Sequence, residues 1–535
     1  MTRTGLARAL AGLALAGAGL VGLAGLGACS KSTHYLAITV SIPAPVYDAA
    51  TLTITLSNDG TSRMDSFPLA MLDPKQPTFT VSAPDRTGEL AIAIDALDAG
   101  SLVIGHGTGS AELTADAVTV TLDPTDFVVN TEFAGDQYPT SDFEASGFQL
   151  ASDGTSWTVG FADGCPTNAC SLFGRQFDAN GKPLSTALAA SANQFTLSTA
   201  PTTFESAVAI ATQGTTTLAV WDYYDATDTT GTIHGIACRP IGAGGVALAD
   251  QKTAIATDEA DVVSIAGLAS GNFVASWKII ATDDAIHAAI LKPDCTPLSP
   301  TPIVVATATT STSEVHRAAV ASNHDQILFA WIVDGDLHIR TATSAGVLGS
   351  DVTLMPKLAT QDIEHVRVVA DSTTGFVVVA RWAESDLNPG PGKLELYHLD
   401  ATGKMIGMPA LVTDQTASDA TDLNDDSFGL AIQPGTDTVL VAWHTCGQQG
   451  DGSMCGVFGR YLHADGTPYD AQFVIPTTTE GDQQLPSVVG LTSGFVAVWS
   501  DGSSITPDIS GKAVRARVLQ PPPAAGQPAA SSSAR

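Results

Sequence analysis

Basic residues are scarce in this sequence, because 24 Lys and Arg stand against 55 Asp and Glu and give a formal net charge of −31. A charge of this sign and size repels nucleic acid and anionic membrane surfaces at long range. We therefore expect no nucleic-acid partner. Cationic partners, divalent cations and simple solubility stay open as reasons for the acidic excess.

Helical patterns and catalytic motifs are also missing. Windows rich in Lys, Glu and Leu with helical spacing are rare, and no convincing helix follows residue 28. The motifs Gly-x-Ser-x-Gly and His-Glu-x-x-His and the phosphate-binding loop do not occur. Since 44% of the residues are hydrophobic and 15% are charged, the chain is expected to fold. The sequence predicts an all-β protein and offers no catalytic residue, no metal ligand set and no cofactor, with calcium as the one weak exception below.

The first residues have the pattern of an export signal. Arg3 and Arg8 precede an uncharged Ala/Gly/Leu run at 9–27, which ends in Leu26-Gly-Ala-Cys29. This ending looks like a bacterial lipobox. We predict a lipoprotein signal peptide at 1–28, lipidation of Cys29, and a linker at 29–33, and Ser30 favours the outer membrane. An ordinary signal peptide and an uncleaved anchor are the alternatives.

A Trp at the end of an apolar run recurs every 51 to 61 residues. The six members are Trp221, Trp277, Trp331, Trp382, Trp443 and Trp499, and Phe161 takes the same place one unit earlier. A period of this size indicates a repeat architecture. Because each run is apolar on nearly every residue, we expect a strand buried on both faces. We interpret the six Trp as structural residues that fill the widening space between units.

Each unit has four short strand patterns, which is typical of a propeller blade. Seven units lie within 124–519, and the last one lacks its fourth strand. The segment 127–131 resembles 473–477, the fourth strand of the preceding unit, so we predict that it closes the ring. Before the propeller, period-2 runs at 34–123 predict a small antiparallel β-sandwich. The tail at 520–535 is expected to be disordered. The predicted fold class is therefore all-β, with a seven-bladed β-propeller preceded by a small β-sandwich.

The repeats at about 127–519 and the lipobox at 1–30 together resemble the propeller lipoproteins of Gram-negative bacteria, especially those of myxobacteria and their relatives. The resemblance implies an envelope location, either periplasmic or surface-facing. It implies no reaction.

Six Cys follow Cys29, in a chain whose predicted export permits disulfides. Cys165 and Cys170 lie close together in one unit, and Cys446 and Cys455 lie in the equivalent place of another, so we predict two local disulfides. Cys238 and Cys295 either pair with each other or stay as buried thiols.

The loops between second and third strands, and those between units, should share one face of a propeller, and they are acidic. We name as the candidate binding face Asp222, Tyr223, Tyr224, Asp225, Asp334, Asp336 and Asp501. Within one loop, Asp422, Asn424 and Asp426 match alternate calcium-ligand positions, but Ser427 and Gln433 replace the expected Gly and Glu. Calcium is thus a weak expectation. His234, His287 and His338 share a place at the start of third strands, too far apart to bind one zinc ion.

Three functions remain open. The first is a non-enzymatic, lipid-anchored binding or scaffold module whose acidic loops engage a protein or a glycan. The second is an exported polysaccharide hydrolase or lyase that uses carboxylates from several blades. The third is a purely architectural envelope protein.

Overall fold

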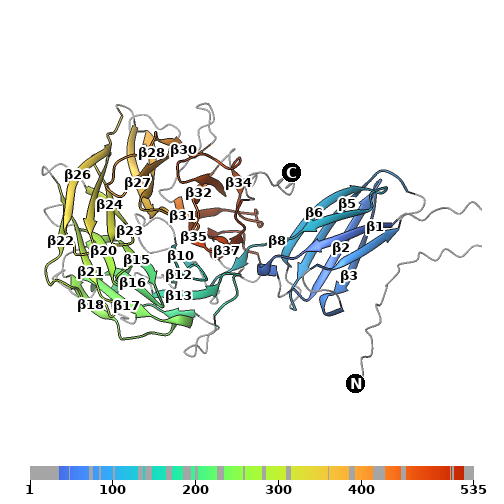
Figure 1. The fold of residues 1–535 in the computed structure, drawn as a ribbon. Helices are drawn as coiled ribbons and strands as arrows, with labels where there is room; N and C mark the ends of the chain where they lie inside the picture. The colour runs from blue at the N-terminus through green and yellow to red at the C-terminus, as the bar shows by residue number, and fades with distance from the viewer. Residues whose placement is uncertain are drawn as a thin grey trace, which may run out of the picture. The chain divides into compact units, whose positions relative to one another are not determined.

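The computed structural model describes residues 35–522, with gaps at 47–48, 72–75, 83–85, 100–102, 131–136, 139–147, 164–170, 185–193, 199–202, 226–233, 257–259, 280–284, 309–314, 359–360, 385–391, 414–427, 447–453, 506–507 and 509–510. It contains two compact units, which meet in sequence between Thr125 and Asp126 (Figure 1). In the described ranges, no helix is long and apolar enough to cross a membrane.

The first unit consists of two small sheets around one core. One sheet has the order β4-β1-β7, with β1 (Tyr35–Ser41), β4 (Thr78–Ser82) and β7 (Ala117–Thr121). The other has the order β3-β2-β5-β6-β8, with β2 (Thr51–Asn58), β3 (Thr61–Pro68), β5 (Glu89–Leu97), β6 (Val103–Glu112) and β8 (Asp123–Pro124). Alternate residues of β1, namely Leu36, Ile38 and Val40, are buried, as period-2 patterning predicts. The pairing of β1 with β7 is parallel, so the unit is not purely antiparallel as we expected.

The second unit is a propeller of seven antiparallel sheets (Figure 1). Blade 1 contains β10 (Gln137–Tyr138), β11 (Gln149–Ser152), β12 (Ser156–Asp163), β13 (Ser171–Asp178) and β14 (Gln194–Thr196). Blade 2 contains β15 (Thr203–Gln213), β16 (Thr216–Asp225), β17 (His234–Ile241) and β18 (Lys252–Ala256), and blade 3 contains β19 (Ala260–Gly267), β20 (Phe273–Ile279), β21 (Ala285–Leu291) and β22 (Ile303–Thr307).

The remaining blades have four strands each. Blade 4 contains β23 (Val315–Asn323), β24 (Gln326–Val333), β25 (Asp336–Thr343) and β26 (Leu348–Met355), and blade 5 contains β27 (Gln361–Ala370), β28 (Phe376–Glu384), β29 (Lys393–Leu399) and β30 (Ala410–Leu411). Blade 6 contains β31 (Phe428–Ile432), β32 (Thr438–Thr445), β33 (Gly456–His463) and β34 (Phe473–Val474). Blade 7 contains β35 (Gln483–Leu491), β36 (Gly494–Asp501) and β37 (Ala513–Leu519), together with β9 (Phe127–Val128) from the start of the unit.

The second strand of each blade is buried on both faces. Every residue of β32 and of β36 is buried, and the six repeated Trp are at most 1% exposed. Each of these strands lies between the two neighbours of its own sheet and also between two adjacent blades. The structural interpretation of the repeated Trp is confirmed.

The ring closes at blade 7, where β9 pairs antiparallel with β37. Phe127 lies opposite Ala516, and Val128 lies opposite Arg515. Beyond the strand, the Val129 amide donates to the Val514 carbonyl over 2.7 Å. The paired segment therefore occupies the position that its resemblance to 473–477 predicts, although the strand itself is shorter than 127–131.

A repeated Arg joins each of five blades to the blade before it. Five arginines occupy the same register position on their third strands and donate to a carbonyl next to or within the outermost strand of the preceding blade: Arg175 to Val129, Arg239 to Thr196, Arg340 to Val305, Arg460 to Val412 and Arg517 to Ile475. Burial lowers the pKa of Arg175 to about 10, so this guanidinium stays charged at neutral pH.

Candidate functional site

Asp334 and Asp336 are the predicted binding residues that lie in an accessible turn. The turn joins β24 to β25 in two residues, and both have positive φ, 51° at Asp334 and 86° at Gly335. Such a pair forms a type I′ hairpin turn, which Asp and Gly favour. Asp334 is exposed and Asp336 is half-buried. The connection is shorter than the long loop that we predicted, because the hairpin closes directly.

This turn lies against the first strand of blade 5. The Ile363 amide donates to the Gly335 carbonyl over 3.0 Å, and a Cβ on Gly335 would lie 2.6 Å from Asp362 Oδ1. Asp334, Asp336 and Asp362 therefore lie at one boundary, with Glu364 two residues further along β27, and we call these four residues the blade 4/5 acidic patch. Glu364 lies at a register shift of β27, where the strand bulges.

Two cations partly balance the blade 4/5 acidic patch. Lys357 Nζ donates to the Asp334 carbonyl over 2.6 Å and lies 3.9 Å from Asp362 Oδ1, and the Lys357 amide donates to Asp336 Oδ1 over 2.8 Å. Arg381 pairs with Glu364, whose side chain is 41% exposed. Among the described residues the four carboxylates thus outnumber the two cations on a partly exposed surface, which suits the binding of a cationic group.

The four predicted residues of blade 2 belong to a strand rather than to a loop. The last four residues of β16 are Asp222, Tyr223, Tyr224 and Asp225, and this end of the strand pairs with β15 and β17. Asp222 and Tyr223 are buried. The prediction that these residues form an acidic loop is wrong, because β16 continues past Trp221 while β15 absorbs the register shift between Glu205 and Val208.

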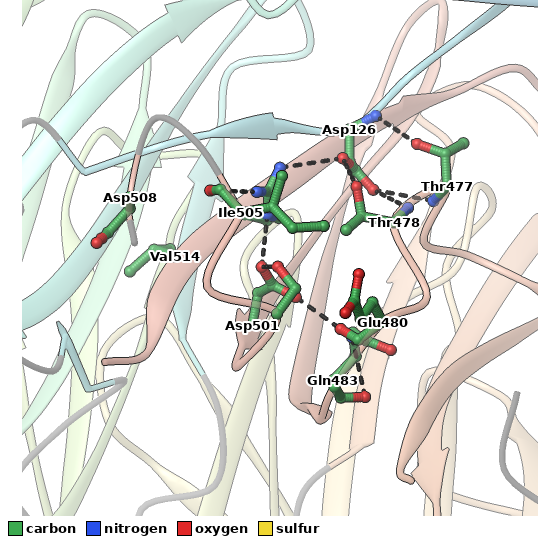
Figure 2. A network of polar contacts seen from close by, with 12 residues as sticks. Asp126, Thr477, Thr478, Glu480, Gln483, Asp501, Ile505, Asp508 and Val514 are labelled. Atoms are coloured by element: carbon green, nitrogen blue, oxygen red, sulfur yellow. Dashed lines mark hydrogen bonds and ion pairs between the residues drawn. The ribbon is translucent and has the colours of Figure 1, made fainter. Parts of the chain in front are cut away.

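Asp501 was predicted to lie on the binding face, but it is buried. Its side chain is 1% exposed and accepts a 2.6 Å bond from Arg515 Nε, a 2.5 Å bond from Ser503 Oγ and a 3.3 Å bond from Gln483 Nε2. Figure 2 shows Asp501 within a network of polar contacts. A carboxylate held in this way by a buried guanidinium is structural and does not meet a ligand.

The same guanidinium binds Asp126, which sequence reasoning missed. Arg515 Nη1 lies 3.3 Å from Asp126 Oδ1, and Asp126 also accepts bonds from the amides of Thr477 and Thr478 over 2.9 and 2.8 Å (Figure 2). The side chains of Arg515 and Asp126 are 5% and 3% exposed. Arg515, near the end of the propeller sequence, thus links Asp126, the first residue of the propeller, to Asp501 on the neighbouring strand β36.

A second set of bonds extends this network along the closing segment. Asn130 Nδ2 donates to Gln137 Oε1 over 3.0 Å and to Asp508 Oδ2 over 2.9 Å, and the Val514 amide donates to Asn130 Oδ1 over 3.0 Å. All four residues are at most 2% exposed. We call the buried residues Asp126, Asn130, Gln137, Asp501, Asp508 and Arg515 the closing network. Its bonds join the two ends of the propeller, and its side chains are buried.

The turns on the opposite face of the propeller use their Asp side chains to hold backbone amides. Asp400 Oδ1 accepts bonds from Thr402 Oγ1 and from the amides of Thr402 and Lys404, and the Thr402 side chain is the main cause that lowers the Asp400 pKa. Burial raises the pKa of Asp371, but hydrogen bonds from His398, Thr373 and Gly375 outweigh it and leave the pKa lowered. These acids cap short turns, as Asx turns do.

The cysteines pair partly as predicted. Cys446 and Cys455 form a disulfide, and Cys455 is buried beside Gln484. Cys238 and Cys295, which the sequence left open, form a second disulfide between blades 2 and 3. Cys165 and Cys170 lie outside the described residues, as do Cys29 and the candidate calcium ligands Asp422, Asn424 and Asp426.

The histidines do not form one repeated position. His287 and His338 lie opposite Trp277 and Trp331, but His234 lies opposite Tyr224, three residues beyond Trp221. The placement of His234 with the other two was therefore wrong. Within the part of the chain that the structure describes, no group of three or more His, Cys, Asp or Glu side chains is arranged to hold a metal ion.

Comparison with known proteins gives only distant structural similarities. No protein-family model and no curated protein sequence matches the chain. Similar solved structures include an ulvan lyase of polysaccharide lyase family 25 (8% identity, 73% of this chain and 96% of that chain, TM-score 0.46) and a protein of unknown function from Dyadobacter fermentans (10%, 75% and 98%, 0.43). An α-L-arabinanase from Penicillium chrysogenum is also similar (11%, 74% and 99%, 0.41). At these identities and scores, the similarities do not extend to an activity.

Proposed function

We propose that the protein is a non-enzymatic, lipid-anchored binding module of the cell envelope, which engages a cationic group of a protein or glycan through the blade 4/5 acidic patch. The observation that carries the proposal is the position of Asp334, Asp336 and Asp362 at one accessible boundary, with Glu364 nearby on the same strand as Asp362 and with Lys357 and Arg381 as the described cations that contact these acids. The closing network supports it, because a closed ring holds such a patch in a fixed shape and reduces the entropy lost on binding.

The alternative of a polysaccharide hydrolase or lyase has less support. Among the described residues, Asp126 and Asp501 are carboxylates from distant segments that meet at one group, and both are buried and paired with Arg515. A general acid or nucleophile must reach its substrate. The purely architectural reading predicts that neutralising the patch changes no binding.

The proposal is tested with two synthetic ligands, a lysine-rich peptide and a chitosan oligosaccharide. The double variant Asp334→Asn with Asp336→Asn should bind one of them about three- to tenfold more weakly, since exposed ion pairs contribute about 0.2–1 kcal/mol each. Asp325→Asn is the matched control, because Asp325 is exposed in the other two-residue turn of β24, on the opposite face of blade 4. Equal binding by the wild type and both variants would contradict the proposal.

The anchoring part is tested separately. Cys29→Ser should move the protein from the membrane fraction to the soluble fraction, because the acyl chains would have no attachment point. Unchanged sedimentation with membranes would rule out lipidation of Cys29 as the main tether.

A further inference from the structure

The outermost strand of blade 4 is unlike the other outermost strands of the ring. β26 is eight residues long, whereas β14, β18, β22, β30, β34 and β9 have two to five residues. It is the last strand in the order β23-β24-β25-β26, and no described strand pairs with its outer edge. Figure 1 shows β26 on the outside of the propeller. A free edge of this length is a template for an additional strand.

The Arg that secures outermost strands elsewhere is missing next to β26. At the equivalent register position, blade 5 has Glu395, which lies opposite Ala380 as Arg340 lies opposite Phe329. Glu395 instead accepts bonds from Lys393 and Tyr397 of its own strand, over 2.7 and 2.8 Å. Blade 3 also lacks the Arg, but there the Cys238–Cys295 disulfide and a 2.6 Å bond from Lys252 Nζ to Thr296 Oγ1 join it to blade 2.

The neighbouring turn does not cover β26 either. In blades 1, 2, 4 and 6, a Cβ on the glycine of the turn between third and fourth strands would meet the outermost strand of the preceding blade, at Phe127, Phe195, Ile303 and Ala410 respectively. In blade 5 the equivalent Gly403 faces Ile339 and Thr341, which belong to β25. Among the described residues, β26 therefore lacks both contacts, the Arg and the turn glycine, that cover β9, β14, β22 and β30.

The side chains of β26 indicate which partner suits this edge. Val352 is 47% exposed, and Val347 just before the strand is 66% exposed. Asp351 stands between them on the chain, with its carboxylate 49% exposed and 2.9 Å from His338 Nδ1. A second copy of this chain is a poor partner, because two antiparallel β26 strands centred here would bring Asp351 near its symmetry mate and join two chains of net charge −31.

We propose that β26 is a docking edge for an extended, cationic segment of another protein, which adds as a fifth strand to blade 4. Backbone hydrogen bonds to residues 348–355 provide the affinity, a Lys or Arg opposite Asp351 provides the charge match, and apolar residues of the partner cover Val352. This surface uses Asp351 and the backbone of β26, which are not part of the blade 4/5 acidic patch, although the end of β26 at Met355 lies opposite Leu337, the residue after Asp336.

The test uses a synthetic heptapeptide of alternating lysine and valine, with a glutamate-for-lysine version as control, and reads out amide hydrogen exchange of the full exported chain. The lysine peptide should slow exchange at 348–355, the glutamate peptide should not, and Asp351→Asn should weaken binding about two- to fivefold. Consecutive residues of a strand direct their amides to opposite edges, so one of Val352→Pro and Thr353→Pro removes an amide from the outer edge, and that variant should abolish the protection while leaving the melting temperature of the propeller unchanged.

Equal protection by the glutamate peptide would overturn the charge match, and protection retained in both proline variants would overturn the edge-pairing geometry. No slowing of exchange at 348–355 by the lysine peptide would overturn the docking edge itself. Asp334→Asn with Asp336→Asn should leave this protection intact. A failure of the docking edge is therefore distinguishable from a failure of the function proposed for the blade 4/5 acidic patch.

Discussion

In blade 7 the outermost strand is β9, a two-residue segment from the opposite end of the propeller, whereas in blade 4 it is β26, an eight-residue strand that follows β25 directly along the chain. β9 is held by the closing network, in which Arg515 joins Asp126 to Asp501. In the part of blade 5 that the structure describes, no side chain holds β26 in a comparable way. Chain connection keeps β26 in its sheet, so its edge is free, while β9 depends on buried side-chain bonds for the same position.

The comparison predicts that blade 7 is the point at which the ring opens. Deleting 126–130 removes β9 and Asp126, exposes the apolar surface of β37 and leaves Asp501 as the one carboxylate that Arg515 contacts among the described residues. Since burial of a large apolar side chain contributes about 1.5–3 kcal/mol, the loss is a large share of a stability of about 5–15 kcal/mol. Deleting 523–535 is the control and should leave the melting temperature unchanged. Equal melting temperatures for both truncations would remove the closing role of this segment.

Arg515→Met should be the most damaging single substitution in the ring. It leaves Asp126 and Asp501 buried without their cation, which typically costs about 3–5 kcal/mol. Arg517→Met is the matched control two residues away on β37, where the Arg donates to the Ile475 carbonyl. Chemical denaturation of both variants measures the difference. If Arg517→Met destabilises as much as Arg515→Met, the network contributes no more than an ordinary inter-blade bond.

The repeated inter-blade arginines should contribute a smaller, similar amount each. Arg460→Met removes a 2.8 Å bond to the Val412 carbonyl, and a hydrogen bond to a charged group contributes about 1.5–3 kcal/mol. Arg63→Met in the first unit is the control, because its pair with Asp65 is exposed and should contribute about 0–1 kcal/mol. A loss for Arg460→Met no larger than that for Arg63→Met would show that the inter-blade bond is not stabilising.

Acid should loosen the Asp-capped turns of the face opposite the acidic patch. The pKa values of Asp371, Asp400 and Asp465 are lowered from 3.8 in the folded chain, so their stabilisation is present above about pH 4 and is lost as the pH falls through the folded-state values. The effect per exposed turn is small. Hydrogen exchange at residues 399–405 between pH 5 and pH 3 should reveal it, and Asp400→Asn should reduce the pH dependence there. Unchanged exchange over this range would contradict it.

Much of this fold is readable from the sequence, because burial and repetition leave direct marks. The spacing of the six Trp gives the blade period, and the likeness of 127–131 to 473–477 gives the closing position of β9. The sequence could not predict the burial of Asp501 or the position of Asp222 within a strand, since both depend on where β36 and β16 end. In the sequence, an acidic residue after an apolar run predicts a loop, whether or not an Arg from another strand pairs with that residue in the fold.

The inter-blade arginines had a signal that was not used. Arg175 and Arg460 share the motif Phe-Gly-Arg, and an Arg recurs in the third strand of five units. Their role depends on strand register, because each guanidinium must reach a carbonyl of a different blade. Asp126 gave no signal of its own, since its partners Thr477, Thr478 and Arg515 lie more than 350 residues away.

Native-state hydrogen exchange of the Val129 amide tests the closed ring most directly. This amide donates to the Val514 carbonyl at the junction of the two ends, and the amide of the buried residue Ala330 in β24 of blade 4 is its reference. If β9 and the closing network make the ring one cooperative unit, the two amides exchange with the same opening free energy, that of global unfolding. Exchange of the Val129 amide through a much cheaper local opening, with Ala330 still protected, would show that the ring is not held closed at blade 7.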